Sequence, residues 1–130
     1  MSLFDLLVVA HFVGDWMFQT NWMAANKRGR PFSAACVLHC LTYTAVVGAG
    51  LWLASRGGIA DLAFLSATGA VFFLFFTHWL IDGFNLPRRW SDLVNRTDKE
   101  FVLTVVDQTM HLVTLALLAW WLAGGVGLSE

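Results

Sequence analysis

Four apolar runs dominate the chain, and each is long enough to form a helix that crosses a membrane. They cover about residues 3–24, 32–54, 61–84 and 99–122, and short polar links separate them. Each run holds about 22–24 residues, which at 1.5 Å per residue covers a hydrocarbon core of ~30 Å. The pattern therefore predicts an all-α integral membrane protein: a single transmembrane domain over residues 1–130, built as an antiparallel four-helix bundle.

Local signals agree with these boundaries. Ser2 and Asp5 suit the start of the first helix, and Asp61 is a candidate N-cap for the third. The segment 90–98 is short, mixed and charged, so we expect it to lie along the bilayer surface. The spacing within Thr97–Glu100 is that of a capping box and predicts that the fourth helix begins there.

Composition supports a membrane environment. The 130 residues are 58% hydrophobic and 13% charged, whereas ordinary soluble domains carry about 25% charged residues. The net charge is −1, and no basic, aromatic-interleaved surface suggests a nucleic-acid partner. The N-terminus lacks a basic region ahead of the first apolar run, so we expect that run to be retained as a helix.

The cations predict an orientation. Basic residues cluster in the first and third links, whereas the second link contains Arg56 alone. The clustered cations are Lys27, Arg28, Arg30, Arg88, Arg89, Arg96 and Lys99. By the positive-inside rule both basic loops face the cytoplasm and both termini lie outside, in a multi-pass protein of the cytoplasmic membrane.

Each predicted helix also carries one polar stripe at helical spacing. The stripes are His11, Asp15, Gln19 and Asn26; Cys36, His39, Cys40 and Tyr43; His78, Asp82 and Asn85; and Thr104, Asp107, Gln108 and His111. Counted from the basic loops, all four lie at similar depth, roughly 5–20 Å below the cytoplasmic boundary. Antiparallel packing would therefore bring four histidines and three aspartates into one layer.

Histidine and aspartate at this density indicate a metal site. Ionisable side chains inside a bilayer are costly and call for partners, and a divalent ion would offset several carboxylates. The candidate ligands are His11, Asp15, His39, His78, Asp82, Asp107 and His111, enough for one or two ions. Zinc suits them best, with iron or manganese as alternatives. Gln19, Gln108, Thr104 and Asn85 are candidates for hydrogen bonds to the ligands.

The two cysteines do not extend this metal site in an obvious way. Cys36 and Cys40 lie one turn apart on the same predicted helix, a poor placement for a structural disulfide, so we expect free thiols. Together with Tyr43 we expect them to be neighbours of the site.

Three motifs carry a family resemblance. His11-x-x-Gly14-Asp15-x-x-x-Gln19, Thr77-His78-x-x-Ile81-Asp82 and Asp107-Gln108-x-x-His111 resemble the blocks of domain-of-unknown-function family 3307, small bacterial membrane proteins. The resemblance runs from about Leu6 to Leu112 and implies a bacterial inner-membrane protein, without implying an activity. The His/Asp pattern is also similar in style to bacterial inner-membrane proteins described as metal-dependent hydrolases. Cys36 and Cys40 are not features of either group.

These features favour a membrane-embedded metal-dependent hydrolase. Asp15, Asp82 and Asp107 are candidate catalytic carboxylates, and a site near the cytoplasmic leaflet suits an amphiphilic or lipid-linked substrate. Lys27, Arg28, Arg88 and Arg89 are placed where they could bind its phosphate, although positive-inside topology alone accounts for cations there.

Other functions fit the same stripes. The layer could conduct ions or protons, although the outer halves of the helices are almost wholly apolar. It could also be a structural polar core, or ligate haem through two histidines, which the nearby aspartates disfavour. Helices this few would enclose little substrate alone, so a homo-oligomer is also expected.

Overall fold

The structure is a computed structural model that describes residues 1–60 and 63–124. Its described elements are helices and helical turns: α1 (Leu3–Phe12), η1 (Val13–Met17), α2 (Asn21–Lys27), α3 (Ala34–Arg56), α4 (Phe64–Gly83), α5 (Leu86–Trp90), η2 (Ser91–Asn95) and α6 (Glu100–Leu122). The prediction of an all-helical chain is confirmed. Asp61, the predicted N-cap of the third helix, lies outside the described residues.

The expectation of one continuous helix over residues 3–24 was wrong. The N-terminal capping box forms as predicted, because Ser2 Oγ accepts from the Asp5 amide while the Asp5 carboxylate accepts from the Ser2 amide. At Val13, however, the chain widens into the π-helical turn η1 and then leaves the helix before α2. Thr20 starts α2 by capping the Met23 amide at 3.2 Å. The ten residues of α1 rise only about 15 Å, half of a hydrocarbon core.

A second break follows α4. Asn85 adopts the left-handed conformation (φ 51°), which asparagine tolerates better than most residues, and Pro87 occupies the first turn of α5. The helical pair 66–83 and 86–94 is consequently bent by 56°. The predicted surface segment 90–98 is thus partly helical, continuing α5 into η2. The fourth helix, α6, begins at Glu100, as expected. Thr97 does not cap this helix, because its Oγ1 accepts from the amide of Lys99, which precedes the helix.

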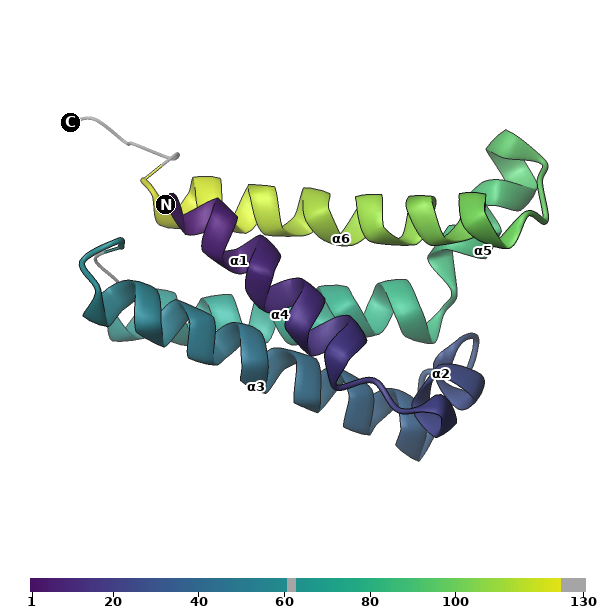
Figure 1. The fold of residues 1–130 in the computed structure, drawn as a ribbon, viewed down its shortest axis with the longest axis horizontal. Helices are drawn as coiled ribbons and strands as arrows, with labels where there is room; N and C mark the ends of the chain where they lie inside the picture. Colours follow the sequence, from purple (N-terminus) through teal and green to yellow (C-terminus); the bar gives the residue numbers. More distant parts are fainter. Residues whose placement is uncertain (61–62, 125–130) are drawn as a thin grey trace.

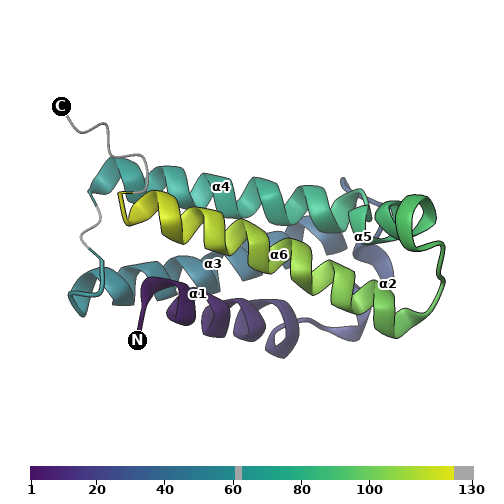
Figure 2. The ribbon, with the colours of Figure 1, turned by 90° about the horizontal axis from the view of Figure 1, so that it is seen from above.

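Among the described residues, α3 and α6 are each long and apolar enough to cross a membrane, and the bent pair of α4 with α5 and η2 could be a third span. The prediction of an apolar helical protein with membrane-spanning helices is supported. The prediction of four complete spans is not. Figures 1 and 2 show α3, α4 and α6 running lengthwise, and Figure 1 shows α1 crossing them obliquely. Both ends of the described chain lie at the end where α3 leads to α4, opposite α2 and α5.

An apolar core fills the half of the bundle nearer the termini. Its largest fully buried side chains come from α1, α3, α4 and α6: Leu7, Tyr43, Val47, Leu74, Leu115 and Leu118. Because the core occupies that half, the polar stripes meet in the other half, next to α2. Polar and apolar packing are therefore segregated along the length of the molecule.

Candidate metal centre

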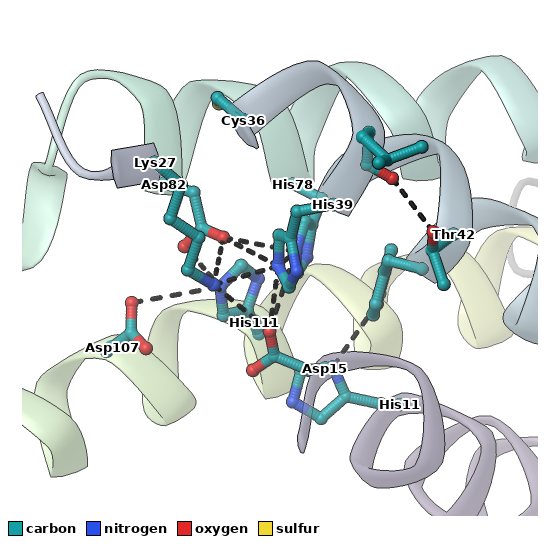
Figure 3. Close-up of polar contacts among 12 residues, drawn as sticks. His11, Asp15, Lys27, Cys36, His39, Thr42, His78, Asp82, Asp107 and His111 are labelled. Carbon is teal, nitrogen blue, oxygen red and sulfur yellow. Dashed lines mark hydrogen bonds and ion pairs between the residues drawn. The ribbon is translucent and has the colours of Figure 1, made fainter. Parts of the chain in front are cut away.

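The polar stripes converge as the spacing predicted. Each histidine and aspartate of the layer is at most 6% exposed, and they come from α1, η1, α3, α4 and α6. The buried set is His11, Asp15, His39, His78, Asp82, Asp107 and His111. Figure 3 shows Asp15, His39, His78 and Asp82 pointing toward one another.

Four of these side chains form one set of candidate ligands. Asp15, His39, His78 and Asp82 each offer an atom, and the four atoms lie within 4.8 Å of one another. His39 Nε2 lies 2.9 Å from His78 Nε2, 3.1 Å from Asp15 Oδ1 and 3.0 Å from Asp82 Oδ2. Ligand atoms around a tetrahedral zinc ion, with bonds of 2.0–2.2 Å, are about 3.3–3.6 Å apart. The observed separations are close to that spacing, so these residues fit a small divalent ion.

Hydrogen bonding alone does not satisfy this set. An imidazole nitrogen carries either one proton or one lone pair, so it can serve one strong partner at a time. His39 Nε2 has four polar atoms within 3.1 Å: Lys27 Nζ at 2.8 Å and the three ligand atoms given above. No placement of protons makes all four contacts favourable, because His39 Nε2 cannot accept from Lys27 and donate to a carboxylate at the same time. Such crowding of nitrogen and oxygen atoms is typical of groups that share a cation.

A second set lies beside the first and shares one member. Asp15, Asp107 and His111 offer three atoms within 4.8 Å of one another. His111 Nε2 is buried, and it has no hydrogen-bond partner among the described residues. It faces two carboxylates instead, with Asp82 Oδ1 at 3.5 Å and Asp107 Oδ1 at 3.8 Å. Asp15 belongs to both sets, and a carboxylate with about four lone-pair sites can serve two cations.

Gln108 holds the shared carboxylate in place. Its Nε2 donates to Asp15 Oδ2 at 3.0 Å and to Asp107 Oδ2 at 3.3 Å, while its Oε1 lies 3.0 Å from His11 Nε2. His11 Nδ1 in turn lies 3.3 Å from the Tyr43 hydroxyl, and the Tyr43 ring stacks on His78 at 3.7 Å. His11 and Tyr43 thus orient the ligand sets from outside them. The sequence-based expectation that His11 itself is a ligand differs from this arrangement, because His11 belongs to neither set.

Lys27 enters the centre from α2, a segment outside the candidate spans. Its side chain is 6% exposed, and Nζ donates to Asp82 Oδ2 at 2.7 Å and to His39 Nε2 at 2.8 Å, with Asp15 Oδ1 at 3.5 Å. Burial lowers the pKa of Lys27, but the carboxylates of Asp82 and Asp15 raise it by more, so the pKa lies above its usual value. The ammonium therefore stays charged at neutral pH.

The remaining residues predicted for the site lie elsewhere. Thr104 Oγ1 donates to the Glu100 carbonyl of its own helix, and Asn85 occupies the bend between α4 and α5. Gln19 Oε1 is buried without a hydrogen-bond partner among the described residues. The other cations predicted to bind phosphate, Arg28, Arg88 and Arg89, are exposed; Arg88 pairs with Asp92 and Arg89 donates to the Phe84 carbonyl.

Cys36 and Cys40 are buried and free, which confirms the expectation of free thiols. Cys36 lies near the close contact between α4 and the α2–α3 link, since a Cβ on Gly83 would be 3.4 Å from its Sγ. Neither cysteine belongs to a ligand set.

An apolar groove of about 560 Å³ runs outside the contact of α4 and α5 with α6. Its lining includes Ile81, Val106 and Met110, each the neighbour in sequence of a buried polar residue: Asp82, Asp107 and His111. On α4 and α6 the groove therefore lies on the helix face next to the one that carries the polar centre.

Lys27 is the member of the centre whose inward role the sequence did not reveal. Its position relative to Asp15 depends on the break at residues 18–20, which a continuous helical projection cannot reproduce. The one signal for this break was the pair Thr20 and Asn21, residue types that favour helix starts.

Comparison with known proteins identifies a family whose description names no activity. No curated protein and no solved structure matches the chain. A family model described as "Protein of unknown function (DUF3307)" matches residues 3–126, which includes the motifs around His11, His78 and His111. The chain therefore belongs to the DUF3307 family.

Proposed function

We propose that this chain is a membrane-embedded protein that binds a divalent metal ion and acts as a metal-dependent hydrolase. The substrate we propose is amphiphilic or lipid-linked, and it is met at the cytoplasmic leaflet of a bacterial inner membrane. The observation that carries the proposal is the buried His/Asp layer, in which two sets of side chains each bring their ligand atoms within 4.8 Å of one another. The sets are Asp15, His39, His78 and Asp82, and Asp15, Asp107 and His111.

Charge supports a bound cation. With neutral histidines, the three aspartates and the one ammonium of Lys27 leave a formal charge of −2 in the buried layer. An uncompensated buried charge costs several kcal/mol, and one divalent ion brings the layer to neutrality. Histidine nitrogen with carboxylate oxygen is an ordinary zinc ligand set, and it also accepts iron or manganese.

The chain supplies groups for hydrolysis around that ion. A bound divalent ion would polarise the scissile group and make water a better nucleophile near neutral pH. Asp15, Asp82 and Asp107 are the proton acceptors available; the Asp107 side chain, 9% exposed, is the most accessible of them. Gln108 keeps Asp15 and Asp107 oriented.

The surroundings favour an amphiphilic substrate. The apolar groove beside the centre could hold a hydrocarbon chain, since its volume lies within the usual range for ligand pockets of about 300–1,000 Å³. Arg88 and Arg89 lie on α5, which also contributes Trp90 to the groove, so a phosphate at the membrane surface would meet cations there.

Metal content tests the proposal. We expect full-length protein, purified in detergent, to carry stoichiometric metal by elemental analysis. Asp15→Asn should abolish it, because Asp15 is common to both ligand sets. Thr109→Val is the matched control, since Thr109 is exposed and bonds to Val105 of its own helix. Wild-type protein that neither carries zinc, iron or manganese nor takes them up would contradict the proposal.

A structural polar core is the second candidate, and the buried pairing of Lys27 with Asp82 and Asp15 favours it. In that case Lys27 would be the permanent counter-ion. Ion or proton conduction is less favoured, because the apolar core around Leu7, Val47 and Leu74 fills the other half of the bundle. Ion flux in liposomes would revive that function.

A further inference from the structure

We propose that the two ligand sets hold different cations: the Lys27 ammonium serves Asp15, His39, His78 and Asp82, and the divalent ion binds at Asp15, Asp107 and His111. This inference rests on the proposed metal-binding function and says which of the two positions the ion takes. It also assigns Lys27 a role other than binding phosphate.

The four-ligand set already has a cation. Lys27 Nζ lies within 3.5 Å of three of its four ligand atoms, and it donates to His39 Nε2 at 2.8 Å. Because an imidazole nitrogen has one lone pair, His39 Nε2 cannot bind a metal ion while it accepts this hydrogen bond. A metal ion could enter this set only by expelling a buried ammonium from two carboxylates.

Among the described residues, no cationic side chain pairs in the same way with the three-ligand set. His111 Nε2 is buried without a hydrogen bond among the described residues, and the charged groups nearest to it are the carboxylates of Asp82 and Asp107. A buried polar atom without a hydrogen-bond partner is costly. A cation between His111, Asp107 and Asp15 would satisfy all three groups at once.

The charge of the layer fits this division. Lys27 offsets one of the three aspartates, and a single divalent ion at the second position offsets the other two. Two divalent ions with Lys27 expelled would instead leave the buried layer positive. Neutrality therefore favours one ion together with one ammonium.

The second position is also the one suited to chemistry. Three protein ligands leave a tetrahedral ion one open position, as in catalytic zinc sites, whereas four ligands close it. Asp107 is the most exposed ligand of either set, with its side chain 9% exposed against 3% for Asp15 and 1% for Asp82. Substrate would approach on the Asp107 side.

Zinc binding to the full-length protein in detergent tests the assignment. We expect one Zn²⁺ per wild-type chain by elemental analysis, and X-ray absorption of that zinc should report one imidazole. His111→Gln should lose the ion, His78→Gln should keep it, and Thr109→Val, on the exposed face of α6, should match wild type.

Several results would overturn the assignment. One zinc with two imidazoles, lost in His78→Gln and kept in His111→Gln, would place the ion in the four-ligand set and leave the proposed function intact. Two zinc ions in wild type would show that Lys27 does not hold its position. Failure of wild type to bind any metal would remove this inference and the proposed function together. The absorption measurement uses wild type, so it decides the matter even if a variant misfolds.

Discussion

Gln108 shows how much of the candidate metal centre depends on single side chains that belong to neither ligand set. One amide group contacts Asp15, Asp107 and His11, which come from η1, α6 and α1. Groups that orient metal ligands in this way usually matter about as much as the ligands, because a misdirected carboxylate binds poorly.

Replacement of Gln108 by leucine should therefore weaken metal binding without unfolding the protein. We expect the zinc dissociation constant to rise about 10–100-fold, since Asp15 and Asp107 lose the donor that fixes them. Competition with a chromogenic chelator would measure it, and Thr109→Val should behave as wild type. An unchanged affinity would mean that the carboxylates hold their positions unaided.

Close backbone contact places α2 and Lys27 against the bundle. A Cβ added to Gly83 on α4 would lie 2.9 Å from the Cα and Cβ of Pro31, and Trp79 Nε1 donates to the Pro31 carbonyl at 2.8 Å. These two contacts fix the link between α2 and α3 on the end of α4, one residue from Asp82. The element that carries Lys27 is therefore positioned by a glycine on another helix.

Gly83→Ala should lower stability, because the new methyl group can be accommodated only if the backbone of Pro31 moves. We expect a loss of about 1–3 kcal/mol, measured by thermal unfolding in detergent. Gly48→Ala is the matched control: its Cβ would meet only Val71 Cγ2, at 3.9 Å, and alanine favours a helix interior over glycine. Equal effects from both variants would argue against the close contact.

The whole molecule is divided into an apolar half and a polar half. The start of α1 and the end of α6 lie at the apolar end, with the end of α3 and the start of α4, and the basic links lie at the polar end. If the basic links face the cytoplasm, the candidate metal centre lies nearer the cytoplasmic leaflet and the apolar core fills the opposite side.

Cysteine accessibility tests that orientation. In a background with Cys36→Ala and Cys40→Ala, we expect Ser55→Cys to react with an impermeant maleimide on intact bacterial cells, because it lies at the weakly charged end. Ala25→Cys, beside the basic link, should react only after permeabilisation. Both positions are exposed. The opposite labelling pattern would reverse the proposed topology.

Sequence alone determined the helical class, the apolar character and the meeting of the His/Asp stripes. These follow from periodicity and depth: residues three or four apart share a helix face, and antiparallel helices with short links place equal depths side by side. Asp82 with His78 and Asp107 with His111 could therefore be assigned to one layer before any contact was known.

Tertiary structure alone decided which side chains of that layer contact one another. The break after η1 turns α2 back toward the bundle and brings Lys27 to His39 and Asp82, whereas a straight helix would have carried it past them. The separation of the stripes into a four-ligand and a three-ligand set, with Asp15 shared, depends on distances of about one ångström. Helical periodicity fixes which face a residue lies on, but such distances follow from how the faces pack.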